Sequence, residues 1–392
     1  MSSAEQTVRV PAGLKGVQVT DTEIGDVRGS EGFYHYRQYS AVELAEKRSL
    51  EDVWQLLLDG SLPANRAASE QFASLVRGQR DLPAGVSEQL PGIVAAGSAS
   101  GDPGGGNPLG SLRTALSLAG SAWGLQPIWD LDQQQLRRDL IRICAATPTL
   151  VAAIYRLSNG LEPIQPDAQL SHAANYLFMV TGERPEAELA RALEQYLILT
   201  VDHGFNSSTF TARVIASTGA DAAAAVVGAI GALSGPLHGG APSRALDTIH
   251  AIGSPERAED YIRGLLSRGE RVMGFGHAVY RTEDPRSAML SGVAQRLGGG
   301  LVDLAVQVEK TVLEVLAETK PERPLYTNVE YYAGVVMDRC GLPEDMFTPT
   351  FAVSRVIGWC ANIAEQARER KLIRPSARYI GPPAPAPVPE AD

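Results

Sequence analysis

The spacing of apolar residues constrains this chain more than any other feature, because they recur every three or four positions along most of its length. Helical periodicity covers residues 133–159, 167–202, 220–234, 254–268 and 346–369. Segment 300–318 places its apolar residues on one helical face: Leu301, Leu304, Ala305, Val308, Val312 and Leu316. Residues 41–63 predict two helices, the second stopped by Gly60 and Pro63. Since no alternating series that would build a sheet is found, we predict an all-α fold.

Segments without this periodicity are few. The sequences VRVPAG and GVQVTDTEI, within residues 1–40, are the only plausible extended pieces. Residues 97–110 are too rich in glycine and proline for a regular element, and we expect a mobile loop there. This loop lacks the Lys-Ser/Thr pair of a Walker motif and the preceding strand of a dinucleotide fingerprint, so phosphate binding is not its expected role.

Composition and charge narrow the class of protein. Hydrophobic residues make up 44% and charged residues 20% of the chain, which is ordinary for a soluble enzyme. No apolar run reaches the roughly 18 residues of a membrane span, and the first residues show no secretion signal, so we expect a cytoplasmic protein. A formal net charge of -10 argues against nucleic acid and anionic membrane surfaces as partners. Anionic substrates would therefore have to be bound by local arginines.

Three histidines, His203, His238 and His277, lie in glycine-flanked or turn-like settings. Glycine next to histidine allows unusual backbone conformations and close approach of a ligand, although a structural histidine is the alternative for each. They are separated by 35 and 39 residues without a close cysteine or acidic partner, so a zinc site is not indicated. Proton transfer and polarisation are the remaining chemistry, because no Gly-x-Ser-x-Gly turn surrounds Ser207 or Ser208.

The other polar candidates have no such setting. We expect His35, His172 and His250 to be structural or surface residues, and Cys144, Cys340 and Cys360 to be buried thiols.

Four segments resemble, in order and spacing, the signature segments of citrate synthases. They are GPLHGGA (235–241), GFGHAVYR with DPR (274–281 and 284–286), TNVEYY (327–332) and SRVIGW (354–359). The opening GLKGVQVTDTEI also looks like the start of the family, and the resemblance covers roughly residues 12–382.

This resemblance implies a two-domain helical fold and an enzyme of the tricarboxylic acid cycle. It predicts a large domain from residues 1–241 and 346–382, a small mobile domain at 242–345, and a disordered proline-rich tail at 383–392. The implied reaction condenses acetyl-CoA with oxaloacetate and hydrolyses the thioester to citrate and CoA, without a metal or other cofactor. A homodimer with shared active sites is implied as well.

The resemblance also assigns roles to residues. His238 would donate a hydrogen bond to the thioester carbonyl, and His277 would polarise and protonate the ketone of oxaloacetate. Arg281 would meet a phosphate of CoA. The two carboxylates of oxaloacetate would be held by His203, Arg286, Arg355 and, from the partner subunit, Arg374.

Glu330 is a departure from the family. It stands where citrate synthases usually carry the aspartate that abstracts the methyl proton, and it is one methylene longer. Glutamate can act as the same general base if the backbone withdraws by about a bond length. Gln38 and Asn107 also depart from the usual residues, glycine and histidine, and no function is attached to either change.

Two alternatives stay open at this point. A 2-methylcitrate synthase would use propionyl-CoA, which differs by one methylene, a discrimination worth only about 1–3 kcal/mol. The other alternative is a catalytically weak or regulatory paralogue, which only the Glu330 change supports.

Overall fold

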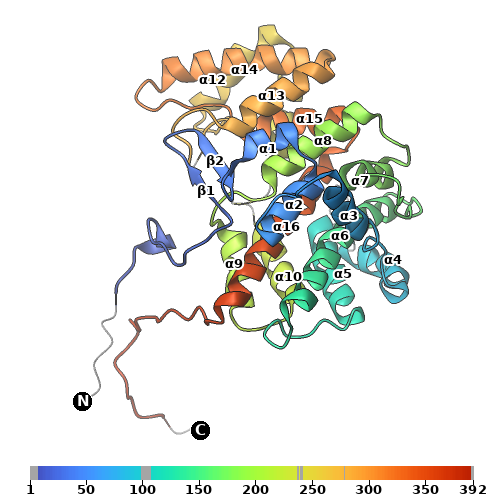
Figure 1. Ribbon diagram of the computed structural model, residues 1–392. Helices are drawn as coiled ribbons and strands as arrows, with labels where there is room; N and C mark the ends of the chain where they lie inside the picture. The colour runs from blue at the N-terminus through green and yellow to red at the C-terminus, as the bar shows by residue number, and fades with distance from the viewer. Residues whose placement is uncertain (1–7, 99–106, 236–237, 239–241, 278, 390–392) are drawn as a thin grey trace.

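The computed structural model describes residues 8–98, 107–235, 238, 242–277 and 279–389, and it is built almost entirely of helices (Figure 1). The longer helices of the described residues are α1 (Ala41–Lys47), α2 (Leu50–Asp59), α3 (Arg66–Arg77), α4 (Ala84–Ser98), α5 (Pro108–Ala122), α6 (Gln133–Ser158), α7 (His172–Thr181), α8 (Ala187–Thr200), α9 (Ser207–Ala216), α10 (Ala222–Leu233), α11 (Pro242–Ile252), α12 (Ala258–Ser267), α13 (Pro285–Leu297), α14 (Gly300–Thr319), α15 (Val329–Arg339) and α16 (Phe347–Glu369). Short 3-10 turns occupy Ala12–Leu14, Pro255–Arg257 and Glu344–Met346. The predicted all-α fold is confirmed.

Local capping explains where many of these helices begin and end. The side chains of Ser40 and Ser49 accept hydrogen bonds from backbone N–H groups in the first turns of α1 and α2. Gly60 ends α2 in the left-handed conformation, with a φ of 86°. The sequence therefore predicted both helices and the stop between α2 and the next segment. Residues 167–202, predicted as one helical stretch, form two helices, α7 and α8, separated by Gly182.

A small antiparallel sheet was not predicted. It has the order β1-β2-β3 and comprises β1 (Gly25–Arg28), β2 (Phe33–Tyr36) and β3 (Tyr39–Ser40). These strands are too short to show a clear alternation in the sequence, and they follow the segments in which we expected extended chain. The hydroxyls of Tyr34 and Tyr36 tie the sheet to the end of α8 by donating to the carbonyls of Leu199 and Ile198.

The body of the molecule is centred on α6 and α16, which pack against each other and against the helices around them. By length and composition, α6 alone among the described helices would be apolar enough to span a membrane, with a mean hydropathy of 1.4. However, 78% of that apolar window is buried inside the protein, as expected for a core helix.

Helices α11 to α15 gather at one end of the molecule, above the body in Figure 1. Their own packing pairs α13 with α15, α11 with α15 and α12 with α14. They meet the body where α13 and α15 contact α8. The proline-rich segment after α16 has neither helix nor strand as far as residue 389, and the last three residues of the predicted tail, like 99–106 of the predicted loop, lie outside the described residues.

Candidate active site

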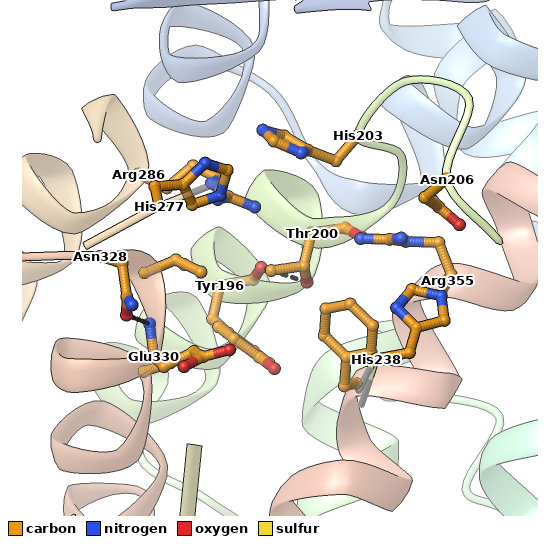
Figure 2. Close-up of a pocket in the computed structure, with 13 residues that line it drawn as sticks. Tyr196, Thr200, His203, Asn206, His238, His277, Arg286, Asn328, Glu330 and Arg355 are labelled. Atoms are coloured by element: carbon orange, nitrogen blue, oxygen red, sulfur yellow. Dashed lines mark hydrogen bonds between the residues drawn. The ribbon is translucent and has the colours of Figure 1, made fainter. Parts of the chain in front are cut away.

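A cavity of about 290 Å³ lies where α13 and α15 meet α8, α9 and α16 (Figure 2). It brings together most of the predicted site residues: His203, His238, His277, Arg286, Glu330 and Arg355. The remaining lining residues are Tyr196, Thr200, Asn206, Asn328, Val329, Ala333 and Phe351. Residues from five distant parts of the sequence therefore converge on one small, partly enclosed space.

His277 is positioned by a glycine loop. Gly274 and Gly276 have φ angles of 85° and 87°, a conformation that favours glycine, as the Gly-Phe-Gly-His motif suggested. The loop is joined to the segment before α15 by backbone hydrogen bonds from Gly276 N to Tyr326 O (2.7 Å) and from Asn328 N to Gly274 O (2.9 Å). The position of His277 is thereby fixed relative to the start of α15.

The hydrogen bonds of His277 determine which ring nitrogen carries its proton. Its Nδ1 accepts from the backbone N–H groups of Val279 (3.0 Å) and Tyr280 (3.1 Å). Burial and the nearby charge of Arg286 lower its pKa to about 4, so the ring is neutral near pH 7. Arg286 also points a terminal nitrogen at Nε2 from 3.2 Å, and a neutral ring has only one acceptor nitrogen. The two backbone donors at Nδ1 therefore favour the tautomer with the proton on Nε2. Arg286 cannot accept this proton, so the Nε2–H can serve a ligand oxygen.

Arg286 is held by a bidentate pair. Its Nε and one terminal nitrogen donate to the two carboxylate oxygens of Asp284 at 3.0 and 2.8 Å. Asp284 also caps the start of α13 and accepts from Val329 N, which ties α13 to α15. Burial alone would lower the pKa of Arg286, but Asp284 reverses this and raises it. One terminal nitrogen is left without a partner among the described residues, available to an anionic ligand.

Arg355 and His203 form the opposite side of the cavity. Arg355 is 2% exposed and donates from Nε to the carbonyl of Thr200 (2.8 Å), so its terminal nitrogens remain for a ligand. His203 contacts Tyr280 through Nε2 and Oη at 3.0 Å. Burial, reinforced by Arg286 and Arg355, lowers the pKa of His203 well below its usual value. This histidine is therefore neutral.

His238 contacts a hydroxyl that has a choice of acceptors. Ser208 Oγ lies 2.8 Å from His238 Nε2 and 2.8 Å from Asn206 Oδ1, and it accepts from Trp359 Nε1 at 3.1 Å. The single hydroxyl proton can go to either acceptor. If Ser208 donates to His238, the imidazole proton is on Nδ1. Burial and then Arg355 lower the pKa of His238, which is again a neutral ring.

Glu330 lies in the first turn of α15. Its backbone N–H donates to Oδ1 of the capping residue Asn328 (3.0 Å), while Asn328 Nδ2 donates to Gly276 O. Burial raises the pKa of Glu330 to about 7, and the nearby charge of Arg286 only partly opposes this. A carboxyl group that titrates near neutral pH is suited to general-base chemistry.

Arg281 and Arg374 do not line this cavity. Arg281 is exposed on the rim and lines a neighbouring cavity of about 270 Å³ that also touches His277. Arg374 is exposed in the segment after α16, which has no regular structure.

Sequence reasoning missed several residues of the site. Tyr280 lay in a quoted motif but was given no role, and Ser208 was considered only as a nucleophile. Tyr196, Thr200 and Phe351 lie within or at the end of helices whose periodicity gives no sign of a pocket. Phe275, between the two glycines, forms an isolated antiparallel β-bridge with Thr327. Local sequence patterns do not predict this contact, because the two segments are distant in the sequence.

A second cavity of about 560 Å³ adjoins the first and shares His277, Asn328 and Glu330 with it. Its walls are apolar at Leu266, Leu316 and Leu325 and carry three cationic side chains: Arg271, Lys320 and Arg323. In the described part of the chain, no group of three or more His, Cys, Asp or Glu side chains could hold a metal ion.

Comparison with known proteins places the chain in a family. The family described as "Citrate synthase, C-terminal domain" matches residues 13–376. A protein named "Putative citrate synthase 2" from Mycobacterium tuberculosis is 38% identical over 376 residues, 94% of this chain and 92% of that protein. The crystal structure of citrate synthase from Thermotoga maritima is 34% identical, covers 97% of this chain and 98% of its own, and superposes with a TM-score of 0.82.

A further structure holds ligands. It is a ternary complex of carboxymethyl coenzyme A and oxaloacetate with citrate synthase from Thermoplasma acidophilum, 26% identical, with a TM-score of 0.85 over 98% of this chain and 99% of its own. The signature segments, the helical fold and these relatives agree, and the chain belongs to the citrate synthase family, as a transferase of the citrate (Si)-synthase type that condenses acetyl-CoA with oxaloacetate.

Proposed function

We propose that the 290 Å³ cavity is the site of this condensation, with Glu330 as the base and His238 and His277 as the hydrogen-bond donors. The observation that carries the proposal is the pairing, in one cavity, of three neutral histidines with a carboxyl group whose pKa is about 7. Such a set can move protons near neutral pH without a metal or other cofactor.

Oxaloacetate is held by its two carboxylates. The unpaired nitrogen of Arg286 and the terminal nitrogens of Arg355 lie on opposite sides of the cavity, and His203 adds a neutral contact. Guanidinium groups match carboxylates in shape as well as charge. The Nε2–H of His277 then donates to the ketone oxygen, where negative charge develops in the transition state.

The chemical steps follow from these positions. Glu330 removes a proton from the methyl group of acetyl-CoA, and His238 stabilises the enol by donating Nδ1–H to the thioester oxygen. The enol carbon bonds to the ketone carbon of oxaloacetate, and His277 gives its Nε2 proton to the new alkoxide. The proton that Glu330 took from the methyl group then replaces the one given by His277, so both groups return to their starting states. Water then cleaves the thioester of the product and releases citrate and the free thiol of CoA. In this scheme Ser208 donates to His238 Nε2, which leaves the proton of that ring on Nδ1.

The adjoining 560 Å³ cavity is the proposed site of CoA. Arg271, Lys320 and Arg323 supply positive charge for phosphates in a chain with a net charge of -10. The apolar walls suit the adenine and the pantetheine arm. Glu330 and His277 belong to both cavities, so a thioester arriving from this side meets the base directly. Arg281 on the rim is within the same cationic surroundings.

Residues 242–345 are proposed to act as a mobile small domain. The cavity lies between α13 and α15 on one side and α8, α9 and α16 on the other, so rotation of the first group would close it. Closure would exclude water while the enol forms.

A homodimer with a shared site is proposed, with Arg374 serving the partner's cavity. Supporting this, the segments before β1 and after α16 run away from the helical body (Figure 1) and expose apolar side chains such as Leu372, Tyr379 and Ile380. Burial of these side chains on a second copy would remove apolar surface from water. Under subunit exchange, inactive His277→Ala and Arg374→Ala variants should restore activity in mixed dimers. No complementation despite proven exchange would contradict the shared site.

The reaction itself is tested by thiol release. Purified protein should liberate CoA thiol from acetyl-CoA only when oxaloacetate is present, in the cytoplasmic setting proposed for an enzyme of the tricarboxylic acid cycle. Propionyl-CoA in a parallel assay measures the acyl preference. Binding of oxaloacetate without thiol release from any short acyl-CoA would contradict the proposed function.

A further inference from the structure

Tyr196 on α8 has a hydroxyl that its surroundings leave unused. The side chain is 1% exposed and lines the active-site cavity, yet apart from a weak interaction with the Thr200 side chain its Oη has no hydrogen-bond partner among the residues described. The neighbouring Thr200 hydroxyl donates to the carbonyl of Tyr196 at 2.9 Å and lies 3.0 Å from Ser354 Oγ. A buried phenol without a partner is unfavourable, and phenylalanine would fill the same space without that cost.

Glu330 presents the complementary deficit. The Glu330 carboxylate accepts no hydrogen bond from the described part of the chain. Only the backbone N–H of this residue is bonded, to Asn328 Oδ1. In Figure 2 the Tyr196 hydroxyl and the Glu330 carboxylate enter the same side of the cavity, opposite His238. A donor and an acceptor that both lack a strong partner therefore share one small space. Burial chiefly raises the pKa of the Tyr196 phenol, Arg355 and the Thr200 side chain lower it, and Glu330 makes the smallest contribution.

We propose that the Tyr196 hydroxyl is a positioning group for Glu330, donating a hydrogen bond to its carboxylate when the cavity closes around the substrates. This inference rests on the proposed role of Glu330 as the base. The helices that carry the two residues, α8 and α15, are in contact across the proposed domain boundary. The bond would thus form across the moving interface and select one conformation of a side chain that is longer than the usual aspartate.

The contact also affects protonation. Burial holds the pKa of Glu330 at about 7, so near neutral pH a large fraction is protonated and inactive as a base. A hydrogen bond from Tyr196 stabilises the carboxylate and lowers its pKa on closure. The other charged or titratable groups around the two adjoining cavities are His203, His238, Arg271, His277, Asp284, Arg286, Lys320, Arg323 and Arg355.

Tyr196→Phe tests the proposal. The turnover number should fall by about 10- to 100-fold, the usual range for a hydrogen bond to a charged group, with oxaloacetate affinity unchanged. The acidic limb of the pH profile of kcat should move up by about 1 pH unit. The Tm should equal or exceed that of the wild type, because a buried unpaired hydroxyl is removed. Unchanged turnover and pH profile would overturn the proposal, and so would a variant that fails to fold or melts well below the wild type.

Tyr176→Phe is the matched control. Tyr176 is fully buried on α7, and its hydroxyl has a structural partner, Thr350 Oγ1, at 2.8 Å. This variant should lose thermal stability while keeping the wild-type pH profile. A shift like that of Tyr196→Phe would mean that loss of any buried hydroxyl disturbs the site, which would overturn the specific role of Tyr196.

A double mutant separates this inference from the proposed function. If Tyr196 acts through Glu330, then Tyr196→Phe should have little further effect on turnover when Glu330→Gln is already present. Equal losses in both backgrounds would mean that the hydroxyl acts elsewhere, and would overturn the inference while Glu330 remains the base. Wild-type turnover by Glu330→Gln alone would instead contradict the proposed function.

Discussion

The two walls of the active-site cavity are built in different ways. On the wall formed by α8, α9 and α16, polar side chains are joined helix to helix: Arg213 donates to Gln366 Oε1 (2.9 Å) and pairs with Glu365, and Asn362 links Gly358 to Asp202. The wall of α13 and α15 has the buried Arg286–Asp284 pair. Its other groups are held differently: His277 depends on backbone hydrogen bonds of a glycine loop, and the Glu330 carboxylate has no donor among the described residues.

The two walls therefore suit different tasks: the first suits substrate recognition, and the second suits groups that move when the cavity closes. Side-chain contacts buried between α9 and α16 hold together the helices of the wall that carries Arg355, which suits recognition of a dianion. Loop backbone and an unpaired carboxylate can shift with little loss, which suits groups that must adjust when the cavity closes. We therefore expect changes on the first wall to affect stability and changes on the second wall to affect turnover.

Removing Glu330, the proposed base, should give the largest effect and would support a catalytic role for the wall of α13 and α15. Glu330→Gln keeps the shape but not the base, so turnover should fall about 10²- to 10⁴-fold with oxaloacetate affinity nearly unchanged. Glu330→Asp should retain measurable activity. Wild-type kcat/KM should rise with pH through about 7, because the base works only when deprotonated and its pKa lies there.

The Glu330→Gln variant should lose turnover but gain stability above neutral pH. The pKa of Glu330 is about 7 in the folded protein against an ordinary 4.5, so between these values the folded state binds more protons than the unfolded state. This group therefore lowers stability as the pH rises from about 5 to 7. Glu330→Gln should be more stable than the wild type at pH 8 and similar at pH 4 in chemical denaturation. A variant less stable at both pH values would contradict this account.

Breaking the network of the first wall should instead reduce stability. Arg213 is fully buried, and Arg213→Ala leaves the carboxylate of Glu365 without its charged partner, a loss of about 3–5 kcal/mol in the free energy of unfolding. Denaturant titration measures it. The control is Arg263→Ala, whose partners Glu259 and Glu318 are exposed, with an expected change below about 1 kcal/mol. Equal losses of unfolding free energy for the two variants would mean that the buried Arg213 network does not stabilise the first wall more than an exposed ion pair does.

Substrate should couple the two walls. In the proposed arrangement oxaloacetate reaches Arg355 on one wall and Arg286 with His277 on the other, so its binding should close the cavity and raise the Tm. In the Glu330→Gln variant, whose turnover should be slow, oxaloacetate should tighten acetyl-CoA binding about 5- to 150-fold by calorimetry. Equal acetyl-CoA affinity with and without oxaloacetate would argue that the walls are independent.

The sequence predicted the helices better than it predicted the cavity. Apolar spacing and caps are local, so α6 and α14 were found with bounds correct to within a residue or two, and α1 and α2 were found as two helices within residues 41–63. The family resemblance also pointed to six residues that meet in the cavity, although Arg281 and Arg374, which it named as well, do not line it. The site roles of Tyr196 and Ser208 were not predicted because each lies in an ordinary helical pattern. Their roles depend on contacts with residues that are distant in the sequence. The short strands β1 to β3 escaped because two to four residues carry too little alternation.

The small sheet contacts the loop that carries His277, on the wall of α13 and α15, and a change at this contact should have the smallest effect. A Cβ at Gly29, in the turn between β1 and β2, would lie 2.3 Å from the carbonyl oxygen of Val279, and Arg281 N donates to Gly29 O at 2.9 Å. Gly29→Ala must therefore displace backbone that supplies both hydrogen bonds to His277 Nδ1. Since a shift of 1 Å can cost about a hundredfold in rate, a smaller displacement should lower turnover about tenfold, with little change in Tm. Gly85→Ala, whose Cβ would touch nothing within 4 Å, should leave turnover unchanged in the same thiol-release assay. Wild-type turnover by Gly29→Ala would mean that the loop absorbs the displacement before it reaches His277, and that the second wall adjusts even more freely than its few hydrogen bonds suggest.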